Sequence, residues 1–123
     1  MKLRINGNSL RLRLNQSEVA QFSKTGFIED RIQFTPSGKF TYTIESSSNL
    51  SAPHASFQDS WLRVEVPAAT AEEWYTTDRV SISGDQPIEA GRALSILIEK
   101  DFQCAHGERD PKAYPNPLEE QVR

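Results

Sequence analysis

The sequence contains little that could cross-link, anchor or export the chain. It has a single cysteine, Cys104, which has no partner for a disulfide within the chain. Its apolar runs are a few residues long, whereas a bilayer-spanning helix needs about 20 consecutive apolar residues. Residues 1–6 lack the apolar core of a secretory signal. We therefore expect a cytoplasmic protein with no membrane segment.

A strong charge of one sign is also missing. The 14 basic and 17 acidic residues give a net charge of −3 and an isoelectric point of about 5.4. This balance argues against a nucleic-acid binder, whose affinity depends on neutralising phosphates. The charges are unevenly placed, with seven basic against four acidic residues in 1–54 and seven against thirteen in 55–123.

Short alternating segments dominate the remaining pattern. Apolar residues alternate with polar ones on both sides of Gly7-Asn8, which predicts a β-hairpin. Asn15 and Glu18 have the spacing of a capping box, and Gly26 is suited to end the helix that follows. Further strands are expected at 27–34, 40–44, 55–57, 61–66, 80–83 and 94–98, with a second helix at about 67–75 that begins at Pro67.

This order of elements occurs twice. A shift of 52 residues places Phe22 on Trp74 and Ile28 on Val80, and a two-residue insertion then continues the match. We predict an α+β fold of predominantly antiparallel sheet, or a partial barrel, built from a duplicated strand–strand–helix–strand–strand unit. The alternative is that any two such segments look alike. The half-repeats cover about 2–46 and 54–102 of a single domain, 1–103, and 104–123 form an extended Pro-containing tail.

Three stretches carry a resemblance to a known family. They are Lys2–Leu14 with Ser17-Glu18-Val19 after it, Glu99–Cys104, and Tyr114-Pro115-Asn116-Pro117. In these stretches the chain resembles a family of small uncharacterised bacterial proteins of about 120 residues. The resemblance implies a bacterial, cytoplasmic, single-domain protein, and it implies no activity and no site.

Arginines form the first candidate site. The residues concerned are Arg4, Arg11, Arg13 and Arg63. The first three share the non-core side of two adjacent strands, and Arg63 has the repeat-equivalent place of Arg11. Guanidinium groups gathered on one sheet face could bind phosphate or carboxylate, and this face would line the lumen if the sheet closed into a barrel. The alternative is a solvated face on which the arginines pair across strands with Glu29, Glu45, Glu65 or Glu99.

The second candidate lies near the C-terminus. Cys104 and His106, with Asp110 nearby, could ligate a metal or supply a nucleophile and its base. Zinc would need a further ligand, such as Asp110 or His54. A free cysteine is more often a small core residue, so we expect no metal and no cofactor.

These observations favour a non-catalytic binding or protein-interaction module whose partner is a second copy of the chain (a homodimer) or another protein. The sequence has no phosphate-binding glycine loop, His-Glu-x-x-His or nucleophile elbow, so an enzyme is the less favoured interpretation. The first alternative is binding or processing of a small anionic compound on the arginine face, and the second is the metal site. Trp61 is the large aromatic side chain that we expect to be an exposed contact.

Overall fold

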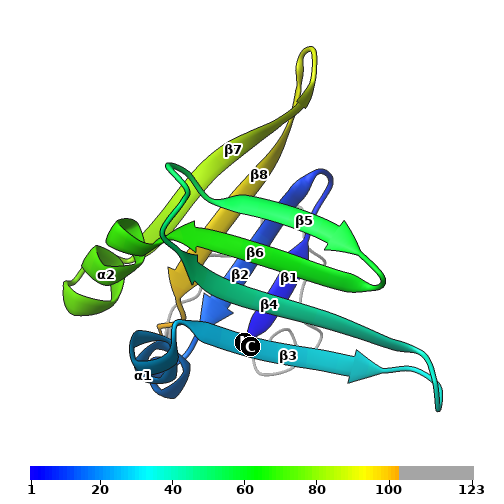
Figure 1. The fold of residues 1–123 in the computed structure, drawn as a ribbon, viewed down its shortest axis with the longest axis horizontal. Coiled ribbons are helices and arrows are strands. Elements are labelled where there is room, and N and C mark those ends of the chain that lie inside the picture. The colour runs from blue at the N-terminus through cyan, green and yellow to red at the C-terminus, as the bar shows by residue number, and fades with distance from the viewer. Residues whose placement is uncertain (103–123) are drawn as a thin grey trace, which may run out of the picture.

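The computed structural model describes residues 1–102, which form eight strands and two helices (Figure 1). In chain order these are β1 (Lys2–Ile5), β2 (Ser9–Leu14), α1 (Gln16–Thr25), β3 (Phe27–Gln33), β4 (Lys39–Ser47), β5 (His54–Gln58), β6 (Trp61–Pro67), α2 (Ala68–Thr76), β7 (Ser81–Glu89) and β8 (Arg92–Lys100). No helix in this part of the chain is long and apolar enough to cross a membrane.

The strands form two four-stranded sheets. Sheet A has the order β1-β2-β8-β7, and sheet B has the order β3-β4-β6-β5. Each hairpin is antiparallel, whereas the central pairs β2–β8 and β4–β6 are parallel. The predicted α+β fold of predominantly antiparallel sheet is confirmed. The strands of residues 1–102 form two separate sheets, which do not close into a barrel.

Each half of the chain contributes one hairpin to each sheet. The first and last hairpins make sheet A, and the two middle hairpins make sheet B. The registers of the central pairs also correspond, because Leu12 faces Ile98 in sheet A and Val64 faces Ile44 in sheet B. Neither half therefore contains a complete sheet.

The inner faces of the two sheets and one side of each helix form the core. Its most buried side chains include Leu12, Ile44, Val64, Ile98 and Trp74. Both helices lie at the same end of the sheets (Figure 1), where Phe22 of α1 meets Trp74 of α2 edge to face with ring centroids 6.2 Å apart. The predicted positions of Phe22 and Trp74 on the buried helix faces are confirmed.

Local signals account for the first hairpin and for α1. Gly7 has a φ of 57° and Gly26 a φ of 69°, in the left-handed region that glycine adopts readily. Asn15 accepts a hydrogen bond from the backbone N–H of Glu18, whose own carboxylate accepts from the N–H of Asn15. The predicted capping box and C-terminal stop are both present.

The prediction of a short strand at 80–83 was wrong, because β7 continues to Glu89. Gly84 and Pro87 interrupt the sequence pattern, yet each is compatible with this position. β7 is an edge strand, where proline is tolerated, and a bulge lies between Pro87 and Glu89. At Gly84, an added Cβ would lie 3.1 Å from Pro53, so glycine leaves room for that ring.

The predicted start of α2 and the predicted repeat partner of Ile28 also need correction. Pro67 is the last residue of β6 and the N-cap of α2, so the helix begins at Ala68. The buried residue that corresponds to Ile28 is Ile82, since these two face Ile44 and Ile98 in the two sheets. Val80, the predicted counterpart, is half-exposed. The two-residue insertion therefore lies between α2 and β7.

Candidate cationic face and its hollow

Four cations share the outer face of sheet A. Leu10, Leu12 and Leu14 of β2 point into the core, so Arg11 and Arg13 between them point outward. The antiparallel register places Arg4 beside Arg11 and Lys2 beside Arg13 on the same face. We call Lys2, Arg4, Arg11 and Arg13 the cationic face.

Two carboxylates at the end of β8 hold three of these cations. Glu99 Oε1 lies 2.6 Å from Arg11 Nε and 2.9 Å from Arg13 Nε. The Arg13 N–H does not point at Glu99, so it is buried without a hydrogen bond among the described residues. Asp101 lies 2.8 Å from Lys2 Nζ and 3.5 Å from Arg13 Nη2. The expected cross-strand pairing with Glu99 is therefore present.

The cations alter the titration of Asp101. The hydrogen bond from Lys2, helped by the charges of Lys2, Arg13 and the N-terminus and opposed by partial desolvation, holds the pKa of Asp101 below its usual value of 3.8. Asp101 is therefore ionised at neutral pH and keeps Lys2 at the edge of the cationic face.

Arg4 differs from the other three cations. Among residues 1–102 no carboxylate lies within 4.0 Å of its guanidinium. It borders a hollow of about 430 Å³ on the outer face of sheet A, which we call the sheet-A hollow. Its polar lining includes Arg4, Arg11 and the three serines Ser9, Ser83 and Ser95. The two guanidinium groups and the Ser83 hydroxyl provide donors suited to carboxylate or phosphate oxygens. The hydroxyl of Ser9 already donates to the Asn6 carbonyl, and that of Ser95 donates to Asp85 at 3.0 Å.

Arg63 does not join this face. It lies on β6 in sheet B, where its Nε donates to Glu45 and its Nη2 lies 4.0 Å from Glu65. The Glu45 carboxylate raises the pKa of Arg63 further, chiefly through this hydrogen bond. Arg63–Glu45 corresponds in register to Arg11–Glu99 of sheet A. The structure thus separates Arg63 from the other three arginines.

The arginines of residues 1–102 do not line an enclosed lumen, as they would in a closed barrel. The inner faces carry the apolar core. The arginines stand on the outer faces, where the side chains of Arg11, Arg13 and Arg63 are 36%, 35% and 42% exposed. No lumen lined by arginine forms in residues 1–102, because the alternation that buries the leucines necessarily turns the arginines outward.

Comparison with known proteins gives a family without an activity. The model of a family described as a family of unknown function (DUF7009) matches residues 1–118. The chain belongs to this family. No curated protein and no solved structure matches it. This match confirms the predicted resemblance to an uncharacterised family, and the bacterial origin stays a prediction.

Three of the four metal candidates of this DUF7009 member, Cys104, His106 and Asp110, lie outside the described residues. The fourth, His54, is exposed on β5. Among residues 1–102 no group of three or more His, Cys, Asp or Glu side chains has an arrangement that could hold a metal ion.

Sequence reasoning missed the serines of the sheet-A hollow. Ser83 and Ser95 lie on β7 and β8, far from Arg4 in the sequence, and polar residues on an outward face give no specific signal. Trp61 was expected to be exposed, and 39% of its surface is accessible on the outer face of sheet B.

Proposed function

We propose that this protein is a non-catalytic binding module that takes an anionic group, a carboxylate or a phosphate, into the sheet-A hollow. The observation that carries the proposal is Arg4, a guanidinium without a carboxylate partner among residues 1–102, beside Arg11 and the Ser83 hydroxyl. A cytoplasmic location in a bacterium is part of the proposal, supported by the single cysteine and by the family resemblance.

The two arginines have different roles in this proposal. Arg11 directs its Nε and Nη2 toward Glu99, which fixes the guanidinium in place. Arg4 presents its whole planar donor set and is the group that would pair with an anion in a bidentate manner. Ser83 also lines the hollow, and its hydroxyl can donate to a further oxygen of the anion.

Calorimetric titration tests the proposal with inorganic phosphate, pyrophosphate and citrate as probes at low ionic strength. We expect at least one probe to bind, and Arg4→Gln to weaken its binding by about ten-fold, as expected for the loss of one charge-assisted contact. Arg63→Gln is the matched control, because it removes the same charge from sheet B, and we expect a change of less than about two-fold. No binding of any probe, or equal losses in the two variants, would contradict the proposal.

A second candidate function is self-association. Phe57 of β5 is 66% exposed although it belongs to the inner face of sheet B, and Phe34 after β3 is 69% exposed. Phe57 lies beside Phe40, with ring centroids 6.1 Å apart. Clustered exposed aromatic side chains are typical of protein interfaces. Sedimentation of the wild type and of Phe57→Ser tests this candidate: a dimer that the substitution dissociates supports it, and a wild-type monomer at high concentration refutes it.

We also propose that the two halves are an internal repeat. The corresponding registers, Leu12–Ile98 and Val64–Ile44, and the identical order of elements support it. Family sequences compared with themselves should match best at offsets of 52 for the first hairpin and helix and 54 for the second hairpin. Equal matching at other offsets would contradict a common origin.

A further inference from the structure

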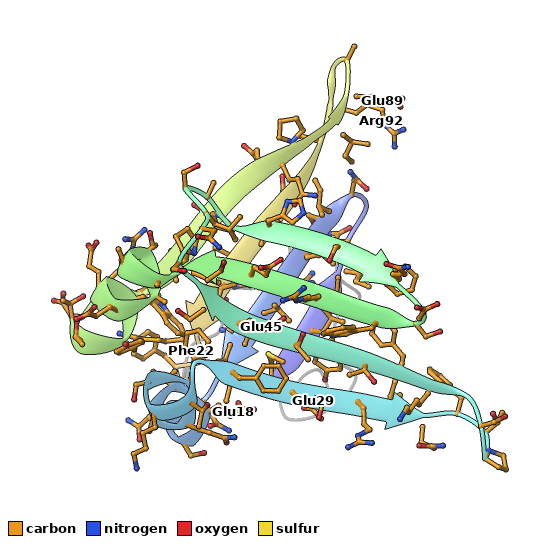
Figure 2. All side chains as sticks on the ribbon, viewed as in Figure 1. Glu18, Phe22, Glu29, Glu45, Glu89 and Arg92 are labelled. Atoms are coloured by element: carbon orange, nitrogen blue, oxygen red, sulfur yellow. The ribbon has the colours of Figure 1, made fainter. Side chains whose placement is uncertain are left out.

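The outer face of sheet B carries a second hollow, of about 360 Å³, which we call the sheet-B hollow. It is lined by Phe27, Glu29, Thr41, Glu45 and Trp61. Figure 2 shows Glu29 and Glu45 on the adjacent strands β3 and β4. The lining therefore combines two aromatic rings with two carboxylates, a composition opposite to that of the cationic face.

The aromatic side chains are exposed, and the indole is fixed. Trp61 and Phe27 are 39% and 38% exposed. The Trp61 Nε1–H donates to Thr43 Oγ1 at 2.9 Å, which holds the ring against β4. A ring held in this way loses little conformational entropy when a ligand packs on it.

The chain's own Arg63 shows what this chemistry holds. Its guanidinium carbon lies 5.6 Å from the centroid of the Trp61 ring, and its Nε donates to Glu45. A planar cation is thus already held on this face by an aromatic ring and a carboxylate together.

Glu29 supplies a carboxylate that is free to take a second cation. Its ion partner among the described residues is Arg31, whose Nη2 lies 4.0 Å from Glu29 Oε2. Both side chains are about half-exposed. A separation of 4.0 Å is too long for a hydrogen bond. The Glu29 oxygens can therefore accept hydrogen bonds from a ligand beside Trp61 and Phe27.

The same place on sheet A has different residues. Trp61 faces Thr41 as Ser9 faces Ser95, and Glu29 faces Thr43 as Ser83 faces Leu97. Phe27 likewise corresponds to Ser81, since these residues face Glu45 and Glu99. Ser9, Ser81 and Ser83 of sheet A thus correspond to two aromatic residues and a carboxylate in sheet B. The two outer faces share their architecture, but the lining of sheet A suits an anionic ligand and that of sheet B suits a cationic one.

We propose that the sheet-B hollow binds a guanidinium group, the arginine side chain of a protein partner. The guanidinium lies on the exposed part of the Trp61 and Phe27 rings and donates to Glu29. This site is independent of the sheet-A hollow, and neither proposal depends on the other.

Nuclear magnetic resonance of the ¹⁵N-labelled full chain tests the proposal with N-acetyl-arginine amide as the probe. We expect the indole N–H resonance of Trp61 to shift in a saturable manner. Trp74 is an internal reference, because its indole is fully buried and donates to the Val80 carbonyl. The glutamine probe, Nα-acetyl-glutamine amide, lacks the charge and should leave the Trp61 indole resonance unshifted. The lysine probe, Nα-acetyl-lysine amide, keeps its ammonium group and should bind at least two-fold more weakly than the arginine probe.

Glu29→Gln should weaken binding of the arginine probe at least three-fold. Glu89→Gln is the matched control, since it removes the same charge at the distant tip of the β7–β8 hairpin, where Glu89 pairs with Arg92 (Figure 2). A Trp61 resonance that does not move, or equal binding of the arginine and glutamine probes, would overturn the proposal. So would equal binding of the arginine and lysine probes, or equal weakening by Glu29→Gln and Glu89→Gln. Because the shift of Trp61 is read directly, a failed anion titration on sheet A leaves this test intact.

Discussion

Replacing Glu99 by glutamine should expose how much the cationic face depends on one carboxylate. Glu99 is 12% exposed in its side chain, and Arg11 and Arg13, which share its Oε1, are 36% and 35% exposed. Removing one partner of a fully buried ion pair costs about 3–5 kcal/mol, and exposed pairs contribute about 0–1 kcal/mol. For a shielded carboxylate with two partly exposed partners we expect Glu99→Gln to lower the free energy of unfolding by about 2 kcal/mol.

Glu45→Gln is the matched comparison, because Glu45 has the corresponding position in sheet B. It is 20% exposed in its side chain and its pairing partner is Arg63, which is 42% exposed. We expect a loss of about 1 kcal/mol. Urea unfolding at pH 7 and low salt measures both values, and added salt should reduce the Glu99 effect only in part. Equal losses in the two variants, or a loss below about 0.5 kcal/mol for Glu99→Gln, would refute this reasoning.

Two further predictions concern the packing of the core and the loss of stability at low pH. Trp74→Phe should cost about 2–3 kcal/mol in urea unfolding, because it leaves a void and removes the 2.8 Å hydrogen bond to the Val80 carbonyl; Trp61→Phe should cost clearly less. Because Lys2 lowers the pKa of Asp101 below 3.8, the stability that this pair contributes is complete above about pH 4 and is lost as pH falls through the lowered pKa. Asp101→Asn should therefore flatten this part of an unfolding profile measured from pH 7 to pH 2, and an unchanged profile would contradict the assignment.

Local elements could be predicted because each depends on neighbouring residues. The Leu-Arg alternation of β2, the turn at Gly7 and the Asn15–Glu18 capping box each specify a conformation within a few residues. The same alternation places the arginines away from the core, so their outward orientation follows from the sequence alone. Cross-strand pairing with Glu45 and Glu99 was one of the two alternatives that the sequence left open.

The assembly of the hairpins could not be predicted in this way. No local signal specifies that β2 lies parallel to β8, where Leu12 pairs with Ile98, or that each sheet combines one hairpin from each half of the chain. This pairing decides that Arg63 belongs to sheet B and that Ser83 and Ser95 face Arg4 and Arg11 across one hollow. The length of β7 was underestimated for a related reason. Gly84 is suited to the strand because Pro53 lies close to it, and Pro87 is tolerated because β7 is an edge strand.

A backbone amide titration of the ¹⁵N-labelled full chain with pyrophosphate shows directly whether an anion binds in the sheet-A hollow. If the sheet-A hollow is the anion site, the largest saturable shifts will belong to Arg4, Arg11, Ser83 and Ser95, and Arg4→Gln will raise the pyrophosphate concentration that saturates them about ten-fold. The first turn of α1 is the obvious competing anion site, but Asn15 and Glu18 already cap it. Shifts concentrated there, or spread over both sheets without saturation, would contradict the account.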